Sequence, residues 1–370
     1  MPRNLRIAYF AHSIRSDWNN GNAHFLRGLM RALGSMGHTV TIFEPEREWS
    51  LENLLTEPKG EASLQQFQQI YPDLHIVTYQ ACEEQQVWHD RLCNYDVVIL
   101  HEWNTPALAT MLVDLREHCG YKLLFHDTHH RASSSPASIN AFRLRRFDGV
   151  LAFGRVLEDI YRYRYDIDAV WTLHEAADTT VFKPSADITP EQQLVWIGNW
   201  GEGERNAEIR AYLLQPAKQL TDMTQTTIYG VRYPEEGLRE LCNANVTYGG
   251  YLPNLEAPAV YAQAAATVHI PRQQYSKVMA GIPTIRVFEA LACGIPLVSA
   301  PWLDSEGLFR DSDFIMAESA PAMRMSLQWL LRNRNAAEEQ ALRGLETVLA
   351  RHTCLHRAEE LTAICEELLH

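Results

Sequence analysis

Short apolar runs alternate with amphipathic stretches along the first half of the chain. The run Leu5 to Ala11 predicts a buried strand, and the apolar positions of residues 25–33 recur at helical spacing. With a strand at Thr39 to Phe43, these segments form one βαβ unit, which requires a parallel crossover. Residues 44–95 show no clear pattern. Further strands are predicted at Asp96 to Leu100, Lys122 to Phe125, Gly149 to Phe153 and Ala169 to Thr172.

A second series of the same kind follows a polar, proline-containing segment from Asp178 to Pro190, which we interpret as an interdomain linker. The last fifty residues are helical in pattern. We therefore expect two Rossmann-like domains, residues 1–185 and 186–350, each with a doubly wound parallel sheet, and a helix at 351–370 that crosses back. The strands of the second series are predicted at Leu194 to Ile197, Thr226 to Tyr229, Asn245 to Thr247, Thr267 to Ile270, Pro296 to Ser299 and Phe314 to Met316.

The length, charge and cysteine content of the chain limit the classes of protein to which it can belong. A chain of 370 residues suits two domains, and a formal charge of −13 disfavours stable binding to nucleic acid or to an anionic membrane. No apolar stretch reaches the roughly 18 residues of a membrane span, and the N-terminus lacks a signal peptide, so we expect a cytoplasmic protein. The seven cysteines are scattered without a C-x-x-C pair, which indicates neither a disulfide framework nor a zinc knuckle and suits a reducing compartment.

The segment Gly281 to Gly294 carries the clearest candidate site. It contains a loop, a helix start near Thr284, and then Arg286 and Glu289. Amides at a helix start attract phosphate, Arg286 is a permanent cation, and a carboxylate can accept both hydroxyls of a ribose. Together these features describe a nucleotide-diphosphate pocket. The alternative is that Arg286 and Glu289 form an exposed helix pair that contributes only roughly 0.2–0.5 kcal/mol.

The run Arg286-Val-Phe-Glu-Ala-Leu-Ala-Cys-Gly294, followed by Pro296, resembles the donor-binding signature of GT-B glycosyltransferases. The wider pattern resembles the spore-maturation CgeB-like group within that family and covers nearly the whole chain. It comprises Ile197-Gly-Asn-Trp-Gly201 with Arg205, Tyr229-Gly-Val-Arg-Tyr233, Gly250-Tyr-Leu-Pro253, and His174-Glu-Ala-Ala-Asp178 with Phe182 and Pro184.

This resemblance implies a GT-B architecture, two Rossmann-like domains facing a central cleft with the C-terminal helices packing back. It implies a hexosyltransferase-like enzyme that moves a sugar from a nucleotide-diphosphate sugar to an unidentified acceptor, without metal or cofactor. Glu289 would hold the donor ribose and Arg286 would face the diphosphate. The donor site would also take in residues from three loops, namely Gly281, Pro283, Thr284 and Ile285 before the helix, Gly198 and Asn199 under the phosphates, and Tyr251 and Leu252 beside the base.

One position departs from the family pattern. Many retaining GT-B enzymes carry a glutamate that contacts the donor sugar at the place where this sequence has Gly281. No Asp or Glu lies between Glu256 and Glu289, so that contact is absent or replaced. The identity of the donor sugar, and retention against inversion, therefore stay open.

Three further arginines, Arg205, Arg232 and Arg272, each follow a predicted strand. Ligands bind at the carboxyl edge of open α/β sheets, so these side chains could converge on a pyrophosphate. The alternative is a solvent-facing arginine, which we favour for Arg232.

In the first domain, His126 and Asp127 end a predicted strand, with His129 and His130 behind them. A short contiguous loop rarely wraps consecutive side chains around one ion, which disfavours a metal site. The resemblance implies that His126 faces the donor sugar, with Asp127 as an orienting group or a base. His24 begins a predicted helix and is either a general base or a capping or surface group. Glu102 and Trp103 could contact the acceptor.

Two other functions share this architecture. One is a sugar-nucleotide epimerase, which would convert a donor without any acceptor. The other is a non-catalytic nucleotide-sugar-binding or assembly protein, for which Gly281 is an argument. A Rossmann oxidoreductase is disfavoured because the first loop lacks G-x-G-x-x-G.

Overall fold

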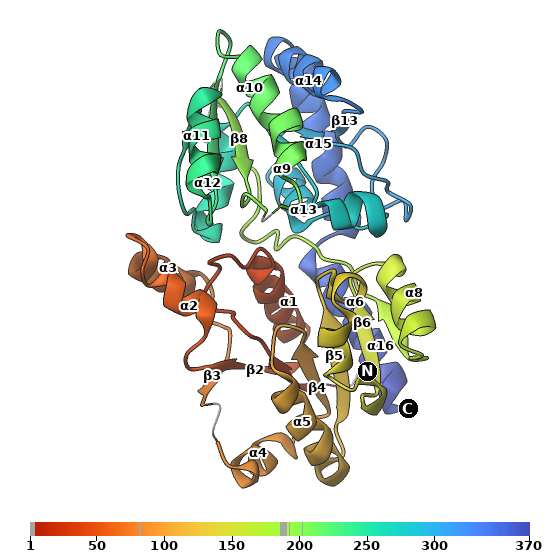
Figure 1. Ribbon diagram of the computed structural model, residues 1–370. Helices are drawn as coiled ribbons and strands as arrows, with labels where there is room; N and C mark the ends of the chain where they lie inside the picture. The colour runs from red at the N-terminus through yellow and green to blue at the C-terminus, as the bar shows by residue number, and fades with distance from the viewer. Residues whose placement is uncertain (1–3, 81–82, 186–190, 192, 202) are drawn as a thin grey trace. The chain divides into compact units, whose positions relative to one another are not determined.

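The structure is a computed structural model that describes residues 4–80, 83–185, 191, 193–201 and 203–370. The chain forms two compact units. The first unit comprises the part up to Glu175 together with Cys354–His370, and the second unit comprises Ala176–Thr353 (Figure 1). The predicted domain boundary at residue 186 and the end of the predicted linker, residues 186–190, lie outside the described residues.

The described residues of the first unit form a sheet of seven parallel strands in the order β3-β2-β1-β4-β5-β6-β7. The strand order reverses between β1 and β4, as in other doubly wound sheets. The predicted strands of this half are confirmed. Their bounds are β1 (Arg6–Phe10), β2 (Thr39–Pro45), β3 (Ile76–Tyr79), β4 (Val97–His101), β5 (Lys122–Asp127), β6 (Gly149–Ala152) and β7 (Val170–Thr172).

Strand β3 and its neighbouring helices fill the stretch where the sequence shows no clear pattern. β3 is an edge strand of four residues, and only Tyr79 within it is fully buried. Its residues, Ile76-Val-Thr-Tyr79, are strand formers, so the sequence carried a short strand signal that the strand prediction did not use. The helices around it are α2 (Trp49–Leu54), α3 (Gly60–Ile70) and α4 (Gln85–Leu92).

Helices cover the central strands of the first unit, and every residue of β4 is buried. The C-terminal helix α16 (Cys354–Leu369) packs against α1 (Ala23–Ser35), as the architecture predicts. His38 Nε2 lies 3.1 Å from the hydroxyl of Thr362 on α16, and Leu361 is fully buried. The other helices of this unit are α5 (Pro106–Cys119), α6 (Arg131–Ser134), α7 (Pro136–Asn140), η1 (Leu144–Arg146) and α8 (Arg155–Arg164).

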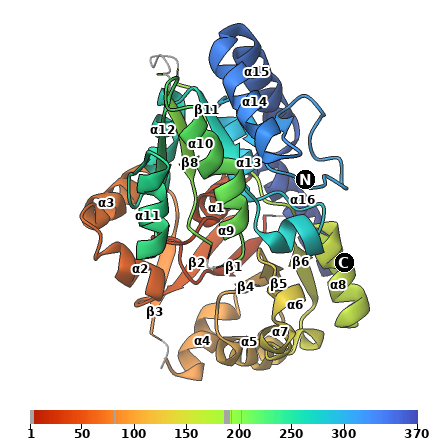
Figure 2. The same ribbon diagram turned by 45° about the horizontal axis from the view of Figure 1, so that its top comes forward.

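The cysteines correct one expectation. Cys93, at the end of α4, and Cys119, the last residue of α5, form a disulfide. These two helices lie side by side (Figure 2), which brings residues far apart in the sequence together. The expectation that no cysteines pair was wrong because it relied on spacing along the chain, whereas the helix packing determines which sulfurs meet.

Glu44 on β2 is fully buried, and its Oε2 atom lies 3.1 Å from Nε of Arg15. Burial raises the pKa of Glu44 from 4.5 to about 7. At pH values between these two pKa values, the folded protein therefore retains a proton on Glu44 that the unfolded chain has released. The stabilising contribution of Glu44 is complete below the unfolded pKa and is lost as the pH rises through the folded pKa. We expect Glu44 to lower the free energy of unfolding by roughly 2 kcal/mol between pH 5 and pH 8.

Urea denaturation of the Glu44→Gln variant at these two pH values measures that contribution. The wild-type protein should lose roughly 2 kcal/mol more than the variant over this range. Glu46→Gln, at an exposed position nearby, is the control and should follow the wild type. Equal pH dependence in all three proteins would show that Glu44 titrates in the folded state as it does in the unfolded chain.

The described residues of the second unit form a sheet of six parallel strands in the order β10-β9-β8-β11-β12-β13. The predicted strands of this half are confirmed. Their bounds are β8 (Gln193–Ile197), β9 (Gln225–Tyr229), β10 (Val246–Tyr248), β11 (Ala266–His269), β12 (Leu297–Ser299) and β13 (Ile315–Met316).

The core of the second unit lies between this sheet and helices on its faces, and includes Trp196, Leu213, Val268 and Leu327. Helices α14 and α15 lie side by side (Figure 2). Among the described residues, no helix combines the length and apolar character needed to span a membrane. The helices are α9 (Asn206–Ile209), η2 (Arg210–Leu214), α10 (Gln215–Gln219), α11 (Glu235–Asn243), η3 (Asn254–Glu256), α12 (Ala257–Gln263), η4 (Gln274–Val278), α13 (Ile285–Ala292), α14 (Ala320–Arg332) and α15 (Arg334–Arg351).

Candidate functional site

The start of α13 lies beside the carboxyl ends of two central strands of the second unit. Thr284 is the N-cap residue, but its hydroxyl meets Nε2 of His269, 3.1 Å away, instead of bonding to an amide of the first turn. Nδ1 of His269 lies 2.8 Å from the hydroxyl of Ser299. Burial lowers the pKa of His269 to about 3, so its ring is neutral. His269 therefore joins the ends of β11 and β12 to the helix start, a role that the sequence analysis missed.

Glu289, one turn into α13, is fully buried. Its Oε1 atom accepts a hydrogen bond of 3.1 Å from the side-chain amide of Asn254, and its Oε2 atom pairs with Arg286. The side chain of Arg286 is 27% exposed and that of Glu289 is 0% exposed, so this is not a solvent-exposed helix pair. A buried carboxylate requires such partners, because removing its charge from water is costly.

The loops after β8, β9 and β10 lie against one another near this helix. The hydroxyl of Tyr233 donates to the carbonyl of Gly198 at 2.7 Å, and Oδ1 of Asn199 accepts from the amide of Val231 at 3.0 Å. A Cβ atom on Gly230 would lie 2.2 Å from the Gly198 carbonyl oxygen, so the backbones approach too closely for any side chain there. The structure thus brings Gly198 and Asn199 together with the loop that carries Arg232. Tyr251 and Leu252 are half-buried in the loop after β10.

Arg205 joins two of the strand ends. Its Nε and Nη2 atoms donate to the carbonyl of Asn199 at 3.1 and 2.6 Å, and Nη1 donates to the carbonyl of Ile270 at 3.4 Å. Burial, and then the positive charges of Arg272 and Arg286, lower the pKa of Arg205 to about 9. Arg205 therefore feels the positive charge of both Arg272 and Arg286, and a bound polyanion would offset that repulsion.

The side chains of Arg272 and Arg232 have different surroundings. Arg272 pairs with Glu204, the residue next to Arg205. Arg232 is exposed, with a left-handed backbone conformation at φ 62°, in agreement with the solvent-facing interpretation favoured from the sequence.

Gly281 is required by the backbone at its position. Its φ angle is +104°, and a Cβ atom there would lie 2.4 Å from Oγ of Ser305. A glutamate at this position would be strained, which gives a physical reason for the departure from the family pattern. The carboxylate of Glu306 lies nearby, with Oε1 3.4 Å from the same Cβ position.

We expect Gly281→Ala to lower the free energy of unfolding by roughly 1–3 kcal/mol, because it adds a clash to an unfavourable φ. Gly307→Ala is the matched control, since Gly307 has a positive φ of 65° but no heavy atom within 4 Å of its Cβ position. Thermal melting compares the two variants. If both lose the same stability, the contact with Ser305 carries no cost.

In the first unit, His126 lies at the end of β5 and is fully buried. Its Nδ1 atom lies 2.8 Å from the hydroxyl of Tyr9, and among the described residues its Nε2 atom has no hydrogen-bond partner. Burial lowers the pKa of His126 to about 3, so the ring is neutral. A neutral imidazole with one uncommitted nitrogen can either donate to or accept from a ligand.

Asp127 is fully buried beside a second buried carboxyl, that of Glu102. Asp127 accepts from the hydroxyl of Tyr161 at 2.5 Å and from the amide of His129 at 2.9 Å. Glu102 pairs with Arg131 at 2.9 Å. Burial raises the pKa of both carboxyls, and the charge of Asp127 raises that of Glu102 further. Asp127 is therefore held in place by Tyr161 and His129, which is compatible with either an orienting group or a base.

His24 lies in the first turn of α1 and is fully buried. The N-cap position of this helix is occupied by Asn22. The burial of His24 contradicts the surface interpretation.

Two further histidines, which the sequence analysis did not select, lie at the ends of neighbouring strands. Nδ1 of His12 lies 3.3 Å from Nδ1 of His101, and the two rings are stacked with centroids 5.3 Å apart. Nε2 of His101 lies 2.9 Å from the hydroxyl of Thr128. Burial lowers the pKa of His12 to about 4. Their position directly after the predicted strands at Leu5 to Ala11 and Asp96 to Leu100 was the available signal.

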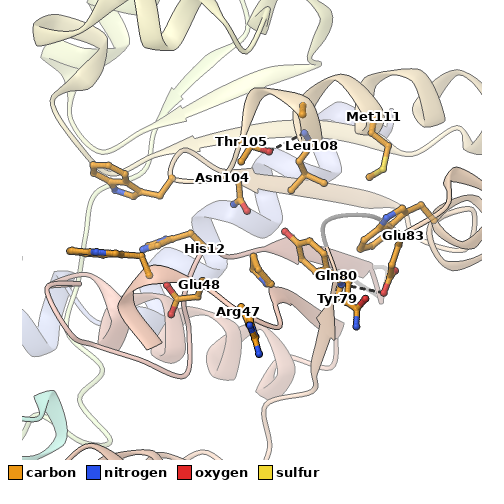
Figure 3. Close-up of a pocket in the computed structure, with 15 residues that line it drawn as sticks. His12, Arg47, Glu48, Tyr79, Gln80, Glu83, Asn104, Thr105, Leu108 and Met111 are labelled. Carbon is orange, nitrogen blue, oxygen red and sulfur yellow. Dashed lines mark hydrogen bonds between the residues drawn. The ribbon is translucent and has the colours of Figure 1, made fainter. Parts of the chain in front are cut away.

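A pocket of about 760 Å³ opens at the carboxyl ends of β1 to β4 (Figure 3). Leu108 and Met111 from α5 face Tyr79 at the end of β3. His12 and Asn104 also line the pocket, which therefore includes the place where the strand order reverses. Open α/β sheets bind ligands at this point.

Comparisons with known proteins agree with this architecture. A family model described as glycosyl transferase-like matches residues 205–363, which is less than half of the chain. No curated protein matches the sequence.

Several solved structures are similar over almost the whole chain. Anabaena Alr3699/HepE, in complex with UDP and glucose, has a TM-score of 0.71 at 10% identity, covering 97% of this chain and 98% of the other. Sucrose-phosphate synthase from Thermosynechococcus elongatus has a TM-score of 0.67 at 15% identity, with coverages of 98% and 99%. A glycosyltransferase from Rickettsia africae has a TM-score of 0.69 at 12% identity, with 99% of both chains covered. At these identities the likeness establishes the fold, and the chain has the two-domain GT-B architecture of these glycosyltransferase structures.

Proposed function

We propose that this protein is a glycosyltransferase that moves a sugar from a nucleotide-diphosphate sugar to an acceptor without a metal ion. The observation that carries the proposal is the buried carboxylate of Glu289 at the start of α13, paired with Arg286, whose positive charge and that of Arg272 also act on the buried Arg205. The glycosyl transferase-like family model covers the same residues, and the similar HepE structure holds UDP and glucose. We further propose a hexosyl donor and membership of the CgeB-like group, which the motifs at residues 197–205, 229–233 and 250–253 support.

The donor would bind with its ribose on Glu289. Oε2 of Glu289 is paired with Arg286, whereas its Oε1 is held by Asn254. The side chain of Arg286 is partly exposed, so it can rotate away and present its charge to the diphosphate. Arg286 would thus exchange one anionic partner for another, and the ribose hydroxyls would take its place at Oε2.

The departing diphosphate gains negative charge as the bond to the sugar breaks. Arg205 and Arg272, together with the amides at the start of α13, would stabilise that charge. Because the guanidinium of Arg205 is already fixed by two carbonyls, little reorganisation accompanies the reaction. In the first unit, His126 is the candidate for contact with a sugar, through Nε2. Asp127 would orient this region, and His24 is the candidate to accept the proton of an acceptor if the reaction inverts.

A thermal-shift panel of UDP, GDP, dTDP, CDP and ADP sugars, each with and without EDTA, tests the donor assignment. One nucleotide should raise the melting temperature irrespective of EDTA, since a ligand at 100 times its Kd adds roughly 2.7 kcal/mol of stability. Product analysis with that donor then decides the reaction. Epimerised donor in the absence of acceptor would favour an epimerase, and tight binding without any transfer would favour a non-catalytic binding protein.

A further inference from the structure

The inner wall of the pocket in the first unit is apolar and rigid. Trp88 lines it and is only 2% exposed, because its ring packs against Phe10, Phe43 and Tyr79 with centroids 5.1 to 5.6 Å away. Leu108 lies opposite on α5, which is fixed at its start by the Thr105 hydroxyl accepting from the Leu108 amide at 3.2 Å. This wall offers almost no hydrogen-bond partners to a ligand.

Two tryptophans at the pocket are exposed to solvent and yet held in place. Trp103 is 42% exposed, and the guanidinium of Arg131 lies 4.2 Å from the centre of its ring. Arg131 is itself held by the buried carboxylate of Glu102. Trp49 is 52% exposed and packs edge-on against Trp18 at 4.9 Å. Exposed indole rings that are already ordered can stack on a ligand without losing further conformational freedom.

The two carboxylates that line the pocket are committed to the protein itself, whereas the side chain of Arg47 also lines it. Glu83 pairs with Arg91, and Glu48 caps α2 by accepting from the amide of Ser50 at 2.6 Å. His12 contributes a neutral ring whose Nδ1 is engaged with His101, so Nε2 is the ring nitrogen that a ligand hydroxyl would meet. The pocket therefore combines an apolar interior of aromatic and aliphatic side chains with polar groups at its edge, among them the neutral ring of His12.

We propose that this pocket binds a molecule with a planar, fused aromatic ring system, and that this ring system is part of the acceptor. The acceptor role rests on the proposed function, whereas the binding itself does not. A volume of about 760 Å³ is ample for such a ring system. A sugar in the same place would leave its hydroxyls against Trp88, Leu108 and Met111, at the cost of unsatisfied hydrogen bonds.

Isothermal titration calorimetry of the full chain with 2-naphthol, in the absence of any nucleotide, tests the proposal. Decahydro-2-naphthol has the same carbon skeleton and hydroxyl but is not planar, and glucose is the polar control. We expect 2-naphthol to bind at least about tenfold more tightly than either, because a planar aromatic ring adds aromatic stacking on the indoles to its apolar contact.

Variants locate the binding. Trp103→Leu and Leu108→Gln should each weaken 2-naphthol binding by about tenfold, the first by removing a stacking surface and the second by placing an amide in the apolar wall. Trp329→Leu is the matched control, because Trp329 is 46% exposed on α14 of the second unit, and it should bind as the wild type does.

The proposal is overturned if glucose or the saturated alcohol binds as well as 2-naphthol. It is also overturned if folded Trp103→Leu and Leu108→Gln both retain the wild-type affinity. Neither outcome affects the nucleotide thermal shifts, which depend on the second unit, so failure here is distinguishable from failure of the glycosyltransferase proposal. A nucleotide shift with no naphthol binding would leave the enzyme assignment standing and remove only the aromatic acceptor.

Discussion

Glu289→Ala will abolish the melting-temperature rise produced by the nucleotide sugar that stabilises the wild-type protein. Two charge-assisted hydrogen bonds from a ribose to a buried carboxylate are worth roughly 3 kcal/mol or more, so we expect affinity for the donor to fall by at least about 100-fold. Titration of the donor against both proteins by calorimetry measures the loss. Glu289→Gln keeps the shape of the side chain and an acceptor for Asn254, and it should show an intermediate loss.

The second unit contains a matched control for this variant. Arg310 and Asp313 form another pair at a spacing of three residues, with Asp313 fully buried and Arg310 47% exposed. Asp313→Ala removes a comparable ion pair away from the start of α13, so it should lower stability but preserve the donor-induced shift. A donor-induced shift of wild-type size in Glu289→Ala would end the ribose assignment, and with it the central argument for the donor site.

Leu361→Ala, in the C-terminal helix, should lower the free energy of unfolding by about 4 kcal/mol. Leu361 is fully buried in the helix that packs on α1, and truncation leaves a cavity in that contact. Urea denaturation followed by tryptophan fluorescence measures the loss.

The control for this prediction lies on the same helix. Leu355 is 46% exposed, so Leu355→Ala removes the same atoms from a position that buries little surface. Its loss should stay below about 1 kcal/mol. Equal losses in the two variants would mean that α16 contributes to stability through its helical propensity and not through its packing on the first unit.

Much of the architecture follows from local pattern. Buried parallel strands appear in the sequence as short apolar runs, because helices cover both faces of the sheet. The two series of strands were therefore predicted to within a few residues. The N-cap at Thr284 and the helix that carries Arg286 and Glu289 follow from the loop and helix signals in the same segment. The exception is β3, a short edge strand of strand-forming residues, Ile76–Tyr79, which the sequence analysis missed.

Contacts between residues far apart in the sequence could not be predicted from such local patterns. Asn254 reaches Glu289 across 35 residues, and His126 meets Tyr9 across 117 residues. The clash that a side chain at position 281 would meet comes from Ser305, in the segment after β12. Cys93 and Cys119 meet because α4 and α5 pack together.

The sequence by itself determined the periodicities, and hence two parallel sheets, the helix start at Thr284, and the residue types at the strand ends. Only the tertiary structure decided that Glu289 is buried with Asn254, that His12 stacks on His101, and that aromatic rings enclose a pocket beside β1 to β4. The physical reason is that secondary structure depends on neighbours within a few residues, whereas burial, pKa and hydrogen-bond partners depend on side chains brought together from distant parts of the chain.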